Sequence, residues 1–111
     1  MGDKKPIRLI VNGDDFGSSH GANNAIIRAH REGILTSASL MVNGNAADNA
    51  VRLARENRHL GVGIHLTLVC GKSTLKPSET FGLVNQRFEF SDSPILAGMK
   101  YFFNRRIHQF L

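Results

Sequence analysis

Apolar and polar positions alternate along the first two thirds of the chain in a pattern that predicts strands and helices in turn. Ile7–Asn12 is nearly continuous in apolar content, which is typical of a strand buried on both faces of a parallel sheet. Helices are predicted over Ala22–Glu32 and Ala46–Glu56, where apolar residues recur at helical spacing. Further strands are predicted over Thr36–Val42 and Gly61–Leu68. This order predicts an α/β fold of parallel strands joined by right-handed crossovers.

The last third of the chain follows a different pattern. Leu83–Val84 and Arg87–Phe90, separated by two residues, predict a small hairpin. Ser93 followed by Pro94 is typical of a helix N-cap with proline at the first helical position. The helix is predicted over Pro94–Phe110. Its apolar face contains Ile95, Met99, Phe102, Phe103, Ile107 and Phe110.

The length of the chain, 111 residues, suits one small domain, taken here as residues 1–111. Three parallel strands with two crossover helices leave sheet edges that further strand–helix units normally cover. The chain is therefore interpreted as the N-terminal, truncated portion of a larger fold. Self-association through an exposed sheet edge is also expected.

The charge balance is basic, with a formal net charge of +5 and a pI near 10.0. The lysines and arginines are scattered and not interleaved with aromatic residues, so no nucleic-acid partner is predicted. No apolar run approaches the ~20 residues that span a bilayer, so no transmembrane segment is predicted. The single cysteine, Cys70, is compatible with a reducing compartment, and a cytoplasmic location is expected.

Two adjacent acids, Asp14 and Asp15, lie within the segment Gly13–Gly17, in a predicted loop over Asn12–Gly21. His65 lies near the end of the third predicted strand. Because the carboxyl ends of parallel strands meet at one sheet edge, where α/β proteins build active sites, these side chains favour a mononuclear metal site with a neighbouring base. Taken singly, the acids also suit helix capping or solvation, and His65 suits a hydrogen-bonded core position.

Several segments, in order, resemble one family of proteins. They are Leu9–Gly17, Ala29–Ser37, Ser39–Gly44, Leu60–Leu68 and Phe102–Arg106. Together they resemble the YdjC-like carbohydrate deacetylases, also called the ChbG/HpnK family. The last segment is similar to a helix of the hopanoid-biosynthesis branch in particular. The resemblance implies a barrel-like (β/α) deacetylase fold that is incomplete in this chain.

The resemblance also implies roles for the acids and the histidine. Asp14 would be the general base, while Asp15 and His65 would be ligands of a divalent metal ion, magnesium or zinc. The family's third ligand, a histidine on a later strand, has no match in this chain. We expect the Asp15 and His65 side chains to converge within ~5 Å, as two ligands of one ion require. Asn43, at the end of the second predicted strand, is a further candidate for contact with a substrate.

Two functions from different classes follow. The first is metal-dependent hydrolysis of the acetamide of an N-acetylated sugar or glycolipid. A divalent metal lowers the pKa of bound water and polarises a carbonyl, which this reaction needs. The second is a non-catalytic remnant or binding module from a shortened reading frame, because one of the three expected metal ligands has no match.

Overall fold

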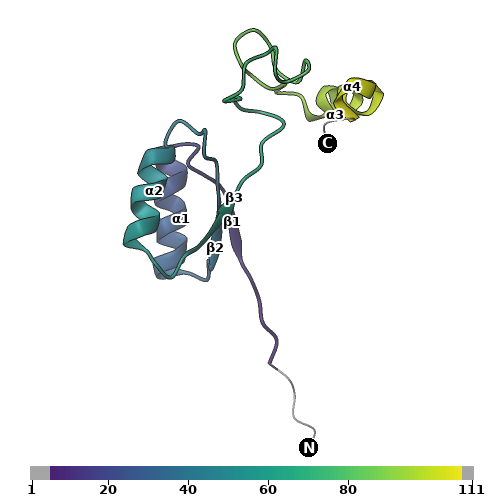
Figure 1. Cartoon of the computed structure of the whole chain (residues 1–111). Helices are drawn as coiled ribbons and strands as arrows, with labels where there is room; N and C mark the ends of the chain where they lie inside the picture. Colours follow the sequence, from purple (N-terminus) through teal and green to yellow (C-terminus); the bar gives the residue numbers. More distant parts are fainter. Residues whose placement is uncertain (1–5, 109–111) are drawn as a thin grey trace, which may run out of the picture. The chain divides into compact units, whose positions relative to one another are not determined.

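The computed structural model describes residues 6–108 (Figure 1). The chain divides into two compact units, Met1–His65 and Leu66–Leu111. In the described residues, the first unit contains a sheet and two longer helices. The second contains loops and two shorter helices.

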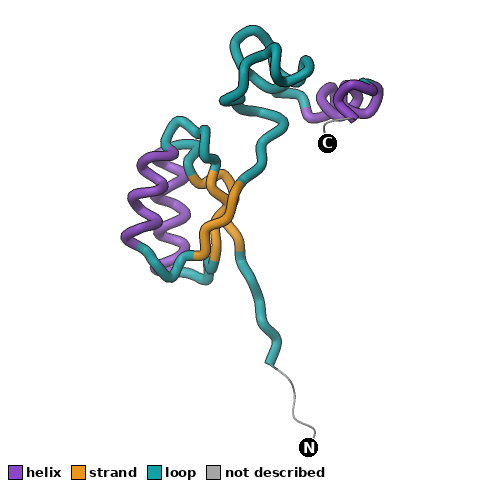
Figure 2. Tube along the Cα trace, in the orientation of Figure 1, coloured by secondary structure: helices purple, strands orange, loops and turns teal. Residues whose placement is uncertain are grey.

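Three parallel strands form the sheet of the first unit, in the order β1-β2-β3. β1 spans Asn12–Phe16, β2 spans Ser37–Leu40 and β3 spans Gly61–Ile64 (Figure 2). β1 pairs with β2, and β2 pairs with β3, both in parallel register. The predicted α/β class and the parallel strand order are therefore confirmed.

Two helices, α1 (His20–Glu32) and α2 (Ala47–Glu56), cover one face of this sheet (Figures 1 and 2). Their apolar stripes pack on Ala38 at the centre of β2, which is 1% exposed. The buried core consists of Phe16, Ile26, Ile27, Ala38, Ala50 and Leu60. Burial of an isoleucine side chain contributes about 1.5–3 kcal/mol, so this small core stabilises the parallel arrangement. Among the described residues of this unit, no helix lies on the opposite face of the sheet.

The first strand lies further along the chain than its apolar content predicts. The prediction of a doubly buried strand over Ile7–Asn12 is wrong, because Ile7 is 97% exposed and Ile10 is 80% exposed. The cause is the register of the sheet. Asn12 lies opposite Ser37, the first residue of β2, so the residues before Asn12 extend past the partner strand.

The other predicted elements of the first unit are present with shifted ends. α1 begins at His20, before the predicted start at Ala22. The second and third strands are shorter than the predicted Thr36–Val42 and Gly61–Leu68. Because β3 ends at Ile64, the candidate histidine follows the strand directly instead of lying within it.

The early start of α1 is explained by its N-cap, Ser19. Its backbone is extended, and its Oγ accepts a hydrogen bond from the Ala22 N–H at 3.1 Å. Ser19→Ala is expected to lower the free energy of unfolding by about 0.5–2 kcal/mol, measured by urea denaturation of the chain. Ser19→Asp, which also caps helices, is the control and should keep most of this stability. An equal loss in both variants would show that the cap is not the cause.

The second unit contains an isolated bridge where the sequence predicts a hairpin. Leu83–Val84 does not pair with Arg87–Phe90 in a ladder, and an antiparallel bridge joins Lys72 to Glu89 instead. The side chain of Asn85 accounts for the difference. Its Oδ1 accepts from two backbone N–H groups of the following segment, at 2.8 and 3.0 Å, and so closes a local turn.

The single helix predicted over Pro94–Phe110 is two helices, α3 (Pro94–Phe103) and α4 (Arg105–His108). Asn104 separates them because its backbone is extended, with φ −92° and ψ 97°. Phe110, part of the predicted apolar face, lies outside the described residues. Among residues 6–108, no helix is both long enough and apolar enough to cross a membrane.

The N-cap of α3 is the predicted Ser93, whose Oγ accepts from the Leu96 N–H at 3.4 Å. Much of the predicted apolar face is exposed, namely Ile95, Met99, Phe102 and Phe103. Ile107 of the same face is fully buried. The Tyr101 hydroxyl donates to the carbonyl of Leu68, and burial raises the pKa of Tyr101 above its ordinary value.

Candidate functional site

The acid pair lies within β1, so the predicted loop over Asn12–Gly21 is wrong in its first part. Asp15 has a left-handed backbone, with φ 62°, and the register with β2 shifts around it. Such a bulge breaks the alternation by which neighbouring side chains of a strand point to opposite faces. The chain therefore redirects the carboxylates at Asp15 itself, before the Phe16–Gly17 turn. Aspartate is one of the few residues that adopt this conformation readily.

The bulge brings the side chain of Asp15 to His65. The Asp15 Oδ1 and His65 Nδ1 atoms are 3.7 Å apart, so the predicted convergence of these two side chains is confirmed. The Asp15 N–H also donates to His65 Nδ1, in a long hydrogen bond of 3.4 Å. His65 is held in turn by its own N–H, which donates to the Leu40 carbonyl at 2.9 Å. The pair therefore joins the ends of β1 and β3 across β2.

Asp14 is oriented by a polar cluster made of Asn12, Ser37 and Ser39. The Asn12 Nδ2 group donates to Asp14 Oδ1 at 2.8 Å and to Ser39 Oγ at 2.9 Å. The Ser37 hydroxyl donates to Asn12 Oδ1 at 2.8 Å. Because Ser37 and Ser39 flank the buried Ala38, they lie on the face of β2 opposite the helices. The cluster holds the Asp14 carboxylate while leaving it accessible to solvent.

Sequence reasoning missed Asn12, although a signal for it exists. In a strand, residues i and i+2 share a face, so a polar residue two positions before a candidate acid can reach it. Asn12 and Asp14 have this spacing, and their side chains are in contact. The signal was hidden because the strand was predicted to end at Asn12.

Asn43 lies in the turn between β2 and α2. This turn follows the carboxyl end of β2, which is the central strand of the sheet. β1, which contains Asp15, lies on one side of β2, and β3, which His65 follows, lies on the other. Asn43 is therefore at the predicted edge of the sheet, and its side chain is half-buried. Its proposed contact with a substrate stays a prediction.

His20, His30 and His59 of the first unit have no contact with the Asp15–His65 pair among the hydrogen bonds of the described residues. His30 Nδ1 lies 2.8 Å from the carbonyl of Leu35, which gives it a structural role at the end of α1. His20 and His59 are exposed, at the start of α1 and just before β3. His108 lies in α4, in the second unit.

The Asp15–His65 pair fits a divalent cation. The Asp15 Oδ1 and His65 Nδ1 atoms are 3.7 Å apart, and a cation bound between them would replace the long hydrogen bond from the Asp15 N–H to Nδ1. A cation between them would stabilise both, and carboxylate and imidazole ligands suit zinc, manganese and related ions. Within residues 6–108, no group of three or more histidine, cysteine or acidic side chains could hold a metal. The described residues thus offer two protein donors.

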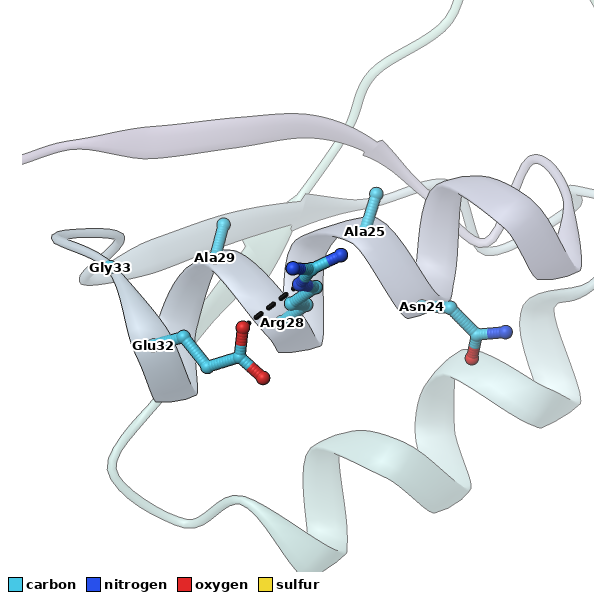
Figure 3. Close-up of a pocket in the computed structure, with 6 residues that line it drawn as sticks. All are labelled: Asn24, Ala25, Arg28, Ala29, Glu32 and Gly33. Carbon is cyan, nitrogen blue, oxygen red and sulfur yellow. Dashed lines mark hydrogen bonds and ion pairs between the residues drawn. The ribbon is translucent and has the colours of Figure 1, made fainter.

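A shallow open groove runs along α1, lined by Asn24, Ala25, Arg28, Ala29, Glu32 and Gly33 (Figure 3). It includes none of the candidate site residues. Its charged side chains are already paired, since Arg28 Nε donates to Glu32 Oε2 at 2.8 Å. These two charged side chains thus face each other across one turn of α1, and the strand ends remain the candidate site.

The fold and the site define an α/β protein with an acid pair and a histidine at the carboxyl edge of a parallel sheet. The sequence model described as "YdjC-like protein" matches residues 8–109. The chain therefore belongs to the YdjC-like family, as its motifs predicted.

Curated relatives match the N-terminal part of this sequence. A carbohydrate deacetylase of Brevibacillus brevis is 55% identical over 78 residues, which are 68% of this chain and 32% of the relative. A carbohydrate deacetylase of Geobacillus stearothermophilus is 47% identical over 85 residues, or 77% of this chain and 34% of the relative. A chitooligosaccharide deacetylase of Salmonella paratyphi B is 55% identical over 64 residues, covering 58% of this chain and 25% of the relative. The matches span about a third or less of the length of these relatives.

A solved structure supports the fold. It is a protein of Enterococcus faecalis V583, provisionally named a cellobiose-phosphate cleavage protein, with 30% sequence identity and a TM-score of 0.72. The match covers 80% of this chain and 35% of that one. The arrangement of strands and helices described above is thus found in a longer, experimentally determined protein.

Proposed function

We propose that this chain carries part of the active site of a metal-dependent carbohydrate deacetylase. The observation that carries the proposal is the 3.7 Å approach of Asp15 Oδ1 to His65 Nδ1, next to a second, separately oriented acid, Asp14. The curated relatives described above are named carbohydrate or chitooligosaccharide deacetylases, which supports a sugar substrate. The proposed substrate class is N-acetylated sugars, with glycolipids as a variant.

In this proposal Asp15 and His65 hold the divalent metal and Asp14 is the general base. A divalent metal, when bound, lowers the pKa of water and polarises the acetyl carbonyl. The Asp14 carboxylate takes a proton from the attacking water, whose oxygen bonds to the acetyl carbon. The carbon–nitrogen bond then breaks as the proton held by Asp14 passes to the leaving nitrogen, and the acetyl group leaves as acetate while the sugar keeps a free amine. The hydrogen bond from Asn12 fixes one oxygen of Asp14 and leaves the other for the proton.

Asn43 is proposed to contact the sugar. Its turn borders the same sheet edge, and an amide side chain both donates and accepts hydrogen bonds, as sugar hydroxyl and acetamide groups require. The polar cluster of Asn12, Ser37 and Ser39 is a second surface with hydrogen-bond donors and acceptors that suit a sugar. This cluster adjoins Asp14 through the hydrogen bond from Asn12.

A binding module or non-catalytic remnant is the second candidate function. It is favoured by the donor count, because catalytic zinc sites usually have three protein ligands and the described residues supply two. In the deacetylase proposal, the third donor lies outside these residues. Chain residues 1–111 alone are then expected to bind metal weakly and to turn over poorly.

The deciding experiment uses a chimera. In the Brevibacillus brevis deacetylase, the segment that matches this chain is exchanged for the matching segment of this chain. The chimera is expected to release acetate from a chitooligosaccharide when supplied with a divalent metal, and to stop when the metal is removed by a chelator. Acetate release that is unaffected by the chelator would contradict metal dependence. A folded, metal-loaded chimera without acetate release would favour the binding module.

The same chimera also tests the identity of the metal and of the substrate, and the isolated chain tests self-association. Metal analysis after purification identifies zinc or magnesium as the preferred ion. Comparison of soluble chitooligosaccharides with an N-acetylated glycolipid tests the hopanoid-branch substrate. Size measurement of residues 1–111 alone tests self-association through the edge strands β1 and β3.

A further inference from the structure

Asn23 is a fully buried polar side chain in the first turns of α1, and it joins two loops. Its Oδ1 accepts from the N–H of Gly17, in the loop after β1, at 2.7 Å. Its Nδ2 donates to the carbonyl of Ala46, just before α2, at 3.0 Å, and to Asn49 Oδ1 at 2.8 Å. The amide is therefore satisfied entirely by groups that lie outside its own helix.

The stability of the α1 helix alone does not explain an asparagine at position 23. Alanine forms helices better than asparagine, and an apolar side chain would suit a fully buried site. A buried amide is unfavourable unless it is hydrogen-bonded. The bonds from Asn23 to the two loops are thus the feature that accounts for its identity and burial.

The two loops that Asn23 joins also contact each other through their backbones. The Met41 N–H donates to the Phe16 carbonyl at 2.7 Å, and the Ala46 N–H donates to the Gly17 carbonyl at 2.9 Å. A Cβ atom at Gly44 would overlap the Gly17 carbonyl, so the approach leaves no room for a side chain. Two hydrogen bonds and one close approach thus fix the chain at Phe16 and Gly17, immediately after Asp15.

This fixed turn determines the conformation of Asp15. The Ser18 N–H donates to the Asp15 carbonyl at 3.0 Å, which closes the turn on the residue itself. Asp15 has φ 62°, which aspartate tolerates but which is uncommon within a strand, and the surrounding contacts enforce it here. The hydrogen bond from the Gly17 N–H to Asn23 Oδ1 is one of the contacts that hold this turn in place.

We propose that Asn23 is a positioning residue for the Asp15–His65 pair. It contacts neither side chain of the pair. By joining the Gly17 loop to the start of α2, it fixes the backbone that directs Asp15 toward His65 and also the loop that carries Asn43. Its effect on metal binding rests on the proposed function, whereas its effect on the Asp15–His65 geometry does not.

The test uses the full 111-residue chain and its Asn23→Ala variant. Nuclear Overhauser contacts between the Asp15 amide proton and the His65 ring report the pair without any metal. Titration with Zn²⁺ reports the proposed site separately. We expect Asn23→Ala to lose the contacts and to weaken Zn²⁺ binding by about 10–100-fold, the range seen when the support of a metal ligand is removed.

Two control variants separate positioning from general stability. Asn24→Ala makes the same substitution one residue later, where the side chain is exposed on the α1 groove (Figure 3). Leu60→Ala removes a buried core side chain just before β3, whereas His65 lies just after this strand. Both are expected to keep the Asp15–His65 contacts and the wild-type Zn²⁺ affinity. Retention of the contacts in Asn23→Ala, or an equal loss in Leu60→Ala, would overturn the proposal.

A second variant covers the case in which Asn23→Ala does not fold. Gly44→Ala keeps every Asn23 hydrogen-bonding group but presses the two loops apart. It is expected to lose the Asp15–His65 contacts as well, and their retention would overturn the proposal. If the wild-type chain binds no Zn²⁺, the proposed metal site fails, and the Overhauser contacts alone still decide the role of Asn23.

Discussion

Asp14→Asn is expected to lower the turnover of the deacetylase chimera by about 10²–10⁴-fold, the usual contribution of a general base. Its Zn²⁺ affinity is expected to stay unchanged. The amide oxygen of an asparagine at position 14 can still accept the hydrogen bond from Asn12, so the geometry of the strand is preserved. What is lost is the ability to take a proton from water. The measurements are acetate release and Zn²⁺ titration on the same preparation.

Asp48→Asn is the matched control for this variant. Asp48 is an exposed acid in the first turn of α2, outside the site, and its substitution makes the same chemical change. It is expected to leave turnover unchanged. If Asp14→Asn instead loses Zn²⁺ while Asp15→Asn retains it, the roles of the two acids must be exchanged.

His65→Ala and Asp15→Asn are expected to abolish tight Zn²⁺ binding. The loss should exceed the about 10–100-fold that follows from removing a hydrogen-bond partner of a metal ligand, because each variant removes a proposed ligand itself. Asparagine is chosen at position 15 because it also tolerates a left-handed backbone, so the bulge is kept. The measurement is Zn²⁺ content and affinity in the chimera, followed by acetate release.

His59→Ala serves as the control for the histidine variant. His59 is exposed and precedes β3, whereas His65 directly follows it, so both lie on the same segment. Unchanged Zn²⁺ binding in His59→Ala together with loss in His65→Ala would assign the ligand to one ring. Full Zn²⁺ binding in His65→Ala would remove this residue from the proposed site.

Much of the first unit follows from its apolar pattern. The stripes of α1 and α2 and the short apolar segment at β2 predict the helices and the parallel order, because each stripe must be buried against a sheet. The start of β1 was not predictable in this way. Ile7 and Ile10 have the composition of a buried strand, but their exposure depends on the register with Ser37, which lies far along the chain. Periodicity carries no information on register between distant strands.

The candidate site, too, was predictable from the sequence only in part. The positions of Asp15 and His65 at one sheet edge follow from strand order, and the structure brings them together. The bulge at Asp15 was not predicted, because a left-handed residue in a strand is set by its tertiary contacts and not by its neighbours in sequence. For Asn23, the apolar pattern predicts only a position within the helix over Ala22–Glu32. Its burial depends on loops that approach it from two other elements.

The left-handed backbone of Asp15 also constrains the evolutionary paths open to this position. Among the residues with a side chain, asparagine and aspartate adopt φ near 60° most readily, and glycine adopts it freely. Glutamate, which would keep the charge, fits this conformation less well. A mutation to asparagine or glycine would therefore remove the carboxylate and leave the fold intact. Folding alone therefore does not preserve the proposed metal ligand at this position, and a single nucleotide substitution can remove the carboxylate while the scaffold is kept.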